Sequence, residues 1–229
     1  MAITALFFDL DGTLCHPAIP FADIVAATCA PLLQGLAEAQ IAALQNAWNA
    51  ALQEPGPSTM PGCLARACAA AGILAKERLI EQCASALTAD WAAAQRLGAG
   101  VAETLAYLGR KYPLGLITNG PSDGQRAVIT ALALDPTFRW RIVSGDANIG
   151  SRKPDTGIFQ HALALAGGAA QDAWYTGDSL VNDIAGAIRA GWRACWIAPL
   201  EAPATAGLPE PDARIARLDD LIPMLETRE

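Results

Sequence analysis

Two aspartates at the end of the first apolar segment have a spacing that could support chemistry. Residues 6–14 read LFFDLDGTL, so a short apolar strand ends in Asp9 and Asp11. Side chains two positions apart on an extended chain point to the same side, which places both carboxylates on one face. Gly12 then lets the backbone turn sharply. Because crowded carboxylates repel one another, the pair indicates a site relieved by a cation or a shared proton. The alternative is a plain Asp-Gly turn of the kind common in hairpins.

Further polar groups follow later apolar runs in the same way. The run 114–117 ends in Thr118, Asn119 and Gly120, and the run 173–176 ends in Gly177 and Asp178. The remaining members of the set are Lys153, before an expected helix start, and Ser179, Asn182 and Asp183, after the last run. Each group closes a strand or opens the next helix. All of them could therefore meet at one edge of a parallel sheet, where ligands bind in open α/β folds.

The order of the expected elements predicts such a sheet. Beyond residue 100, helices expected over 101–112, 122–132, 154–166, 181–190 and 218–225 alternate with strands expected over 113–118, 141–144, 173–176, 194–197 and 214–216. Strands that alternate with helices imply right-handed crossovers and parallel pairing. The Pro- and Ala-rich residues 199–211 are expected as an excursion on the surface.

Between about residues 21 and 97 the pattern changes. Apolar residues recur there at three- and four-residue spacing without β-rich runs, which predicts helices over 22–36, 38–52, 63–71 and 76–91. The Pro- and Gly-rich loop 55–62 divides this segment into two halves. An ordinary connection has a median length of about 4–6 residues, so the segment is an insertion rather than a loop.

Composition narrows the classes of function. The net charge of −7 argues against non-specific binding of nucleic acid, which needs a basic surface. No apolar stretch approaches the roughly 20 residues that span a bilayer, and no basic segment precedes the first apolar run. A cytoplasmic protein without a membrane anchor is expected. Six cysteines form no C-x-x-C pair, and the two histidines stand far apart. These features favour carboxylates and Mg²⁺ over zinc or a Ser-His-Asp arrangement.

The ordered motifs resemble the haloacid dehalogenase-like hydrolase superfamily, in its phosphatase branch, over the whole chain. This resemblance implies an α/β fold with a Rossmann-like parallel sheet core and an inserted all-helical cap domain. The core would comprise residues 1–15 and 99–229, and the cap residues 16–98, with joints near 16–20 and 97–100. Closure of the cap would exclude water and complete the site. The implied activity is a Mg²⁺-dependent phosphatase that hydrolyses a small phosphomonoester through an aspartyl-phosphate. A nucleotide or a sugar phosphate is the expected substrate, and the chain is expected to be a monomer or homodimer.

The resemblance also implies a role for each motif residue in phosphoryl transfer. Asp9 is the expected nucleophile. Asp11 is the expected general acid and base, which requires a pKa raised toward neutrality. Thr118, Asn119 and Gly120 are expected to donate hydrogen bonds to the phosphate. Lys153, one of three lysines in the chain, would add a positive charge beside the phosphate and Asp9.

The same resemblance places a magnesium ion among oxygen ligands, as the ion prefers. Its expected ligands are Asp9, the backbone carbonyl of Asp11, and Asp178. Asp183 and Asn182 are expected beside them, with Asp183 contacting a metal-bound water or orienting Lys153. An alternative for Asp183 is a helix N-cap.

Other functions stay open at this point. A true 2-haloacid dehalogenase of the family carries a non-acidic residue two positions after its nucleophile, so Asp11 favours phosphate esters. A non-enzymatic phospho-accepting regulatory domain would also use an aspartate on a parallel sheet, but such domains lack a cap. Phosphonate cleavage would need a cap lysine, and Lys76 is the one available. Substrate contacts are expected from the loop 55–62 with Arg66 behind it, and His16 could face the same gap.

Overall fold

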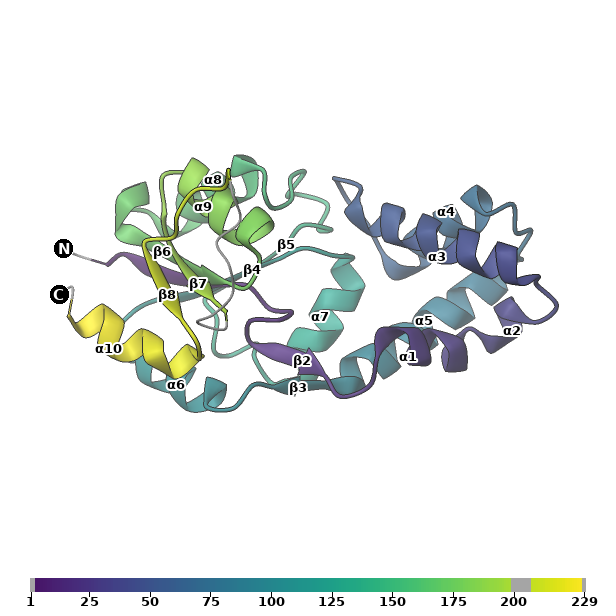
Figure 1. Cartoon of the computed structure of the whole chain (residues 1–229), viewed down its shortest axis with the longest axis horizontal. Helices are drawn as coiled ribbons and strands as arrows, with labels where there is room; N and C mark the ends of the chain where they lie inside the picture. The colour runs from purple at the N-terminus through teal and green to yellow at the C-terminus, as the bar shows by residue number, and fades with distance from the viewer. Residues whose placement is uncertain (1–2, 199–206, 228–229) are drawn as a thin grey trace.

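The chain folds into two lobes joined by a narrow connection (Figure 1). The computed structural model describes residues 3–198 and 207–227. An α/β lobe carries a six-stranded sheet, and a helical lobe contains the inserted segment. Most of the excursion expected over 199–211 lies outside the described residues. None of the described helices is long and apolar enough to span a bilayer.

Parallel pairing organises the sheet of the α/β lobe. Its strands, in spatial order, are β5 (Trp140–Val143), β4 (Leu114–Thr118), β1 (Ala5–Phe8), β6 (Ala173–Gly177), β7 (Arg193–Ile197) and β8 (Ala213–Ile215). Strand β1 lies at the centre, where Phe8 pairs in register with Leu116 on one side and Thr176 on the other. Because these three strands run in the same direction, their carboxyl ends reach the same edge. The alternation of strands and helices thus predicted the parallel sheet correctly.

Helices cover both faces of this sheet. The helices of the lobe are α6 (Val101–Leu108), α7 (Ser122–Ala131), α8 (Thr156–Ala166), α9 (Ala185–Arg189) and α10 (Leu221–Glu226), with short helical turns η1 (Ala170–Asp172), η2 (Leu180–Ile184) and η3 (Leu218–Asp220). Along β1, Leu6 and Phe8 pack with residues of α6, α7 and α10, whereas Phe7 packs with residues of α8 and α9. This alternation follows from the two-residue period of a strand. Strand β1 is therefore buried on both faces.

Two helices of this lobe differ at one end from the bounds expected from the sequence. The helix expected over 101–112 ends at Leu108, because Gly109 follows and the next residues turn into β4. The helix expected from residue 154 begins at Thr156, which leaves Lys153 in the preceding turn.

The helical lobe has a hydrophobic core of its own. It contains α1 (Phe21–Thr28), α2 (Ala30–Leu33), α3 (Glu38–Gln53), α4 (Met60–Ala70) and α5 (Glu77–Ala94). The first expected helix, over 22–36, is broken in two at Cys29, where the backbone leaves the helical conformation before Pro31. The helix expected from residue 63 begins at Met60, because Thr59 caps its first turn. All six cysteines are buried free thiols.

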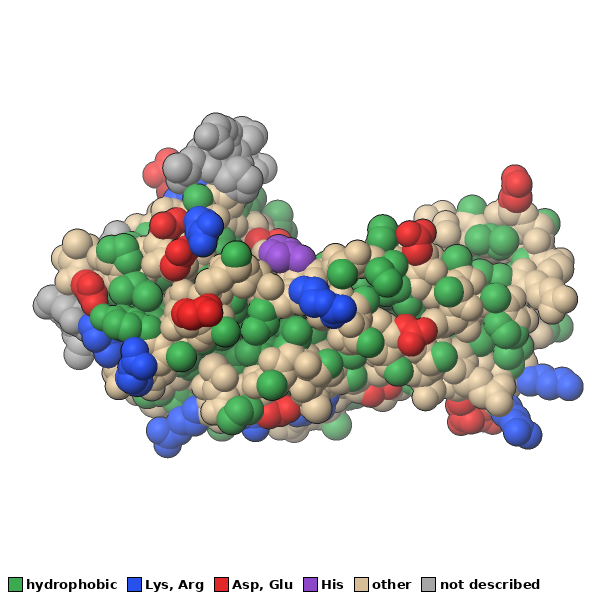
Figure 2. Space-filling model, turned by 90° about the horizontal axis from the view of Figure 1, so that it is seen from below, with side chains coloured by type: hydrophobic (Ala, Val, Ile, Leu, Met, Phe, Trp, Pro, Cys, Tyr) green, Lys and Arg blue, Asp and Glu red, His purple; other side chains and the backbone are tan. Residues whose placement is uncertain are grey.

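A two-stranded antiparallel ribbon connects the lobes. Its strands are β2 (Cys15–Pro17) and β3 (Gln95–Leu97), and His16 pairs with Arg96 at its centre. Both strands are three residues long, and they overlap the joints expected near 16–20 and 97–100. The molecule narrows between the lobes in the view of Figure 2, where charged side chains are scattered over both lobes.

Candidate active site

The carboxyl edge of the sheet brings the sequence motifs together. Asp9 follows β1, Thr118 ends β4, and Asp178 follows β6. A cleft at this edge is lined by Asp9, Asp11, Thr118, Asn119, Lys153, Asp178, Ser179, Asn182 and Asp183. The arrangement follows from the topology, because β1, β4 and β6 are neighbours and end at the same side.

A buried ammonium group lies at the centre of the cleft. Lys153 is 3 % exposed, and its Nζ donates to Asp9 Oδ1 at 2.5 Å and to Asp183 Oδ1 at 2.7 Å. The third donor of this group points to the Tyr175 hydroxyl at 2.8 Å, and that hydroxyl donates to the carbonyl oxygen of Ile117 at 2.9 Å. The ammonium thus has a partner for each of its hydrogens, which offsets the cost of its burial.

Asp183 binds the same ammonium group as Asp9. Its Oδ1 accepts from Lys153, and its Oδ2 accepts from the backbone N–H of Ser179 at 3.0 Å. Ser179, rather than Asp183, caps η2, because its hydroxyl accepts from the backbone N–H of Asn182. The contacts correspond to the predicted orienting role of Asp183 and not to the N-cap alternative.

Burial dominates the electrostatics of the two motif aspartates. It raises the pKa of Asp9 to about 8, with Asp183 and Asp11 acting in the same direction and Lys153 opposing them. Burial also raises the pKa of Asp11, against the hydrogen bond from Gln125 and the charges of Lys153 and His16. Burial by itself disfavours the charged form of Lys153, but Asp183 and Asp9 outweigh it and the pKa of Lys153 is raised. Among the described residues that line it, the cleft therefore gathers four carboxyl groups around one ammonium.

Gln125, on α7, is a site residue that the sequence analysis missed. Its Nε2 donates to Asp11 Oδ2 at 2.7 Å and to Thr118 Oγ1 at 2.6 Å. Because the Thr118 oxygen accepts this bond, its own hydrogen remains available for an acceptor in the cleft. Asp11 Oδ1 is buried and has no partner within the part of the chain that the structure describes. A second missed residue is Thr13, whose hydroxyl donates to Asp9 Oδ2 at 3.3 Å.

The loop after β4 is held by two hydrogen bonds between the Asn119 side chain and the Lys153 backbone. The Asn119 side chain donates to the carbonyl of Lys153 at 2.8 Å and accepts from the N–H of the same residue at 2.9 Å. This pairing holds the lysine backbone against the β4 loop. The Gly120 N–H donates to Ser144 Oγ at 3.0 Å. Its expected hydrogen bond to a phosphate oxygen would therefore have to share this donor with Ser144.

Three carboxylates form a group suited to a metal ion. Single oxygens of Asp9, Asp178 and Asp183 all lie within 4.8 Å of one another. Gly12 has a φ of +86°, and a Cβ at this position would overlap the Asp178 carboxylate. The turn after β1 thus requires glycine both for its conformation and for the close approach of Asp178. Hard oxygen donors crowded in this way fit Mg²⁺.

Two residues considered for substrate contacts do not line the cleft. Arg66 pairs with Glu54 through a contact of 2.9 Å between Nε and Oε2, and its side chain is exposed. A role for Arg66 in substrate contact stays a prediction. His16 is exposed on the ribbon strand β2. The loop 55–62 does reach the α/β lobe, where Ser58 N–H donates to the Gly145 carbonyl at 3.0 Å.

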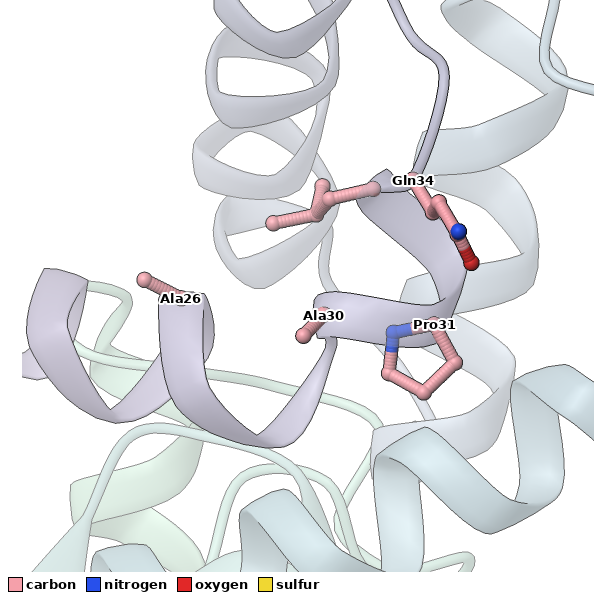
Figure 3. A pocket seen from close by; sticks show the side chains of 5 residues that line it. Ala26, Ala30, Pro31 and Gln34 are labelled. Carbon is pink, nitrogen blue, oxygen red and sulfur yellow. The ribbon is translucent and has the colours of Figure 1, made fainter.

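A separate hollow lies at the junction of α1 and α2 (Figure 3). Its lining consists of Ala26, Ala30, Pro31, Leu33 and Gln34. These side chains offer one amide and no titratable group, so the hollow has no means to carry out chemistry.

Comparison with known proteins identifies relatives of the whole fold. A profile described as haloacid dehalogenase-like hydrolase matches residues 3–191. A phosphoserine phosphatase of Thermus thermophilus is 39 % identical over 88 residues, which are 38 % of this chain and 34 % of that protein. A 5-amino-6-(5-phospho-D-ribitylamino)uracil phosphatase of Escherichia coli is 32 % identical over 97 residues, 42 % of this chain and 38 % of that protein. These matches span little more than a third of the length of the curated relatives. The solved structure of a 2-haloacid dehalogenase from Pseudomonas syringae has a TM-score of 0.77 and 26 % identity, covering 99 % of this chain and 100 % of that one.

Proposed function

The chain belongs to the haloacid dehalogenase-like hydrolase family, and from this premise we propose that it is a Mg²⁺-dependent phosphatase of a small phosphomonoester. One observation carries the proposal: Asp11 stands beside Asp9 with a carboxyl group whose pKa is raised by burial. A protonated acid at this position can supply the hydrogen that an alkoxide leaving group needs. The two curated relatives described above bear the names of phosphatases.

The chemistry is assigned residue by residue. Asp9 attacks phosphorus through a carboxylate oxygen, and the bond between phosphorus and the ester oxygen breaks. Asp11 gives its proton to the departing oxygen and then, as a carboxylate, takes a proton from the water that cleaves the aspartyl-phosphate. Lys153 contributes positive charge beside the phosphate, and the hydroxyl of Thr118 donates to a phosphate oxygen. Gln125 keeps the side chains of Asp11 and Thr118 in place.

Magnesium would be held by Asp9, Asp178 and the backbone carbonyl of Asp11. When bound, the ion supplies positive charge that offsets both the phosphate and the crowded carboxylates. Asp183 accepts hydrogen bonds from Lys153 and from the Ser179 N–H, so its part is to orient the ammonium rather than to bind the metal.

The helical lobe, residues 16–98, would act as a cap over the cleft. Its contact with the core includes the N–H of Met60, which donates to Asp123 Oδ1 at 2.8 Å. The ribbon of β2 and β3 is the connection about which the lobe would move. Closure would exclude bulk water from the aspartyl-phosphate before its hydrolysis.

The test of the proposed activity is phosphate release from a panel of monoesters, with and without Mg²⁺. We expect turnover that depends on the metal and disappears with EDTA. Asp11→Asn is expected to accumulate a phosphorylated protein from an activated ester, because the second step then lacks its base. Absence of release from every ester, in protein shown to be folded by circular dichroism, would refute the proposal.

A second candidate function is 2-haloacid dehalogenation. It is favoured by the full-length similarity to the Pseudomonas syringae 2-haloacid dehalogenase. Halide release from 2-chloropropionate distinguishes the two candidates, because a halide leaves without a proton and makes no use of the acid Asp11. We expect no halide release, and turnover of the haloacid without turnover of any phosphate ester would reverse the assignment.

A further inference from the structure

A second cavity, of about 300 Å³, opens from the catalytic cleft toward the helical lobe. It shares Asp11, Asn119 and Asn182 with the cleft at the carboxyl edge of the sheet. Its size lies at the lower end of the roughly 300–1,000 Å³ that small-molecule sites occupy. A group esterified to a phosphate at the catalytic edge would extend into this cavity.

Three aromatic rings from three helices form the wall on the side of the helical lobe. Phe21 begins α1, Trp48 belongs to α3, and Trp91 belongs to α5. The ring centroids of Phe21 and Trp48 lie 6.3 Å apart at 26°, and those of Phe21 and Trp91 lie 5.1 Å apart at 88°. Phe21 and Trp91 are only half-buried, so part of each side chain remains uncovered. Met60 adds a further apolar surface from α4.

Trp48 adds a hydrogen-bond donor to this apolar wall. The side chain is 7 % exposed, and its Nε1 has no partner within the described part of the chain. A buried indole N–H is normally paired, so an unpaired one beside a cavity indicates a ligand acceptor. A carbonyl oxygen at the edge of a bound ring would supply that acceptor.

The cavity is poor in positive charge. Arg152 is the one basic side chain among its described lining residues, and one of its donors binds the carbonyl of Leu52 at 2.7 Å. The carboxyl group of Asp11 lines the same cavity. The remaining polar groups of the lining are mostly amides, from Gln53, Asn119, Gln125 and Asn182. A leaving group with a second phosphate or a carboxylate would meet little compensation here. An uncharged group with hydrogen-bonding edges would meet several partners.

We propose that this cavity selects a flat, uncharged heteroaromatic ring, so that the substrate is a nucleoside 5′-monophosphate or a phosphate ester of the same chemical class. This inference rests on the proposed phosphatase function and names the alcohol that the reaction releases. The ring lies against Phe21, Trp48 and Trp91, and its carbonyl accepts from Trp48 Nε1. Small acyclic phosphates that carry a carboxylate are poor substrates, because they leave the aromatic wall uncovered.

A matched pair of substrates tests the proposal. Uridine or adenosine 5′-monophosphate contains the phosphoryl ribose of ribose 5-phosphate with a base added. Stacking of one base on aromatic side chains corresponds to about 5- to 150-fold in affinity. We therefore expect kcat/KM for at least one nucleotide to exceed that for ribose 5-phosphate by about tenfold or more. Free nucleoside is also expected to inhibit competitively at concentrations where ribose does not.

Variants then locate the preference. Trp48→Leu and Phe21→Leu are expected to reduce the nucleotide to ribose 5-phosphate ratio at least fivefold, with turnover of ribose 5-phosphate retained. Ile41→Ala serves as the control, because Ile41 lies on α3 and lines the adjoining pocket of the helical lobe but not this cavity, whereas Phe21 and Trp48 line both. Its ratio is expected to equal that of the parent chain.

The possible failures have different meanings. Equal kcat/KM values for nucleotides and ribose 5-phosphate, or an equal loss for both substrates in Trp48→Leu, would overturn the proposed ring selection while the phosphatase assignment stands. If neither substrate nor any other ester of the panel releases phosphate, the proposed function itself has failed.

Discussion

Removal of the Gln125 amide is the perturbation for which the structure gives the clearest magnitude. Gln125 supplies the one hydrogen bond to the Asp11 carboxylate among the described residues, at 2.7 Å. A hydrogen bond to a charged group contributes about 1.5–3 kcal/mol. Gln125→Ala is therefore expected to raise the pKa of Asp11, because a stabilising interaction of this size with the ionised form is lost. The direction follows because this bond lowers the pKa in the parent chain.

The sign of the effect on rate follows from the two roles of Asp11. Its protonated form is needed when the ester oxygen departs, so kcat/KM falls above its pKa. A higher pKa moves this alkaline limb to higher pH. Its ionised form is needed in the second step, so hydrolysis of the aspartyl-phosphate slows at neutral pH.

The assay is the pH profile of kcat/KM for an alkyl ester, such as ribose 5-phosphate, beside p-nitrophenyl phosphate. The shift should appear with the alkyl ester and be small with the nitrophenyl ester, whose leaving group needs no proton. Gln82→Ala, an exposed glutamine on α5, is the control. If the Gln125 variant keeps the parent profile and changes only KM, Gln125 does not tune Asp11 and the reasoning is refuted.

Three further predictions concern the nucleophile, the metal and the core. Asp9→Asn is expected to lower kcat by about 10⁴-fold or more, and residual turnover near the parent value would exclude Asp9 as the nucleophile. Because the pKa of metal-free Asp9 is about 8, Mg²⁺ must displace a proton from it. Calorimetry should show affinity for Mg²⁺ rising by up to about tenfold per pH unit below that pH, and a constant affinity would contradict the assigned ligand. Gly115→Ala would place a Cβ inside the Phe7 ring and is expected to cost about 1–3 kcal/mol of unfolding free energy, measured as a lower urea midpoint.

The residues at the sheet edge could be predicted from the sequence because each one ends a buried strand or starts the following helix. Asp9, Thr118 and Asp178 are separated by long stretches of chain, yet parallel pairing requires the ends of β1, β4 and β6 to coincide. The alternation of strands and helices, together with the polar residues that follow each strand, was enough to predict where the site lies. Helix ends were less predictable, because Gly109 and Thr59 act through local turns and caps that apolar spacing does not encode.

Gln125 and Tyr175 could not be found in this way. Gln125 lies within a helix and reaches Asp11 across 114 positions of the chain, so only the packing of α7 brings them together. Tyr175 reads as one of the apolar residues of β6, but its hydroxyl contacts the ammonium of Lys153. The aromatic wall is a third case, because Trp48 and Trp91 occupy positions on α3 and α5 that helical spacing alone assigns to a core.

The charges at the sheet edge indicate that the ammonium of Lys153 alone does not balance the neighbouring carboxyl groups and a bound phosphate. Lys153 already donates to Asp9 and Asp183, and Asp11 and Asp178 stand close by with pKa values raised chiefly by burial. A phosphate dianion would add further negative charge to a cleft in which four carboxyl groups face one ammonium among the described residues. Burial raises the pKa of Asp9 to about 8, and a protonated carboxyl is a poor nucleophile. A divalent cation would act against both effects, because it favours the ionised carboxylate and attracts the anion. The crowding of carboxyl groups in the cleft is thus a reason to expect a metal that is independent of any likeness to other proteins.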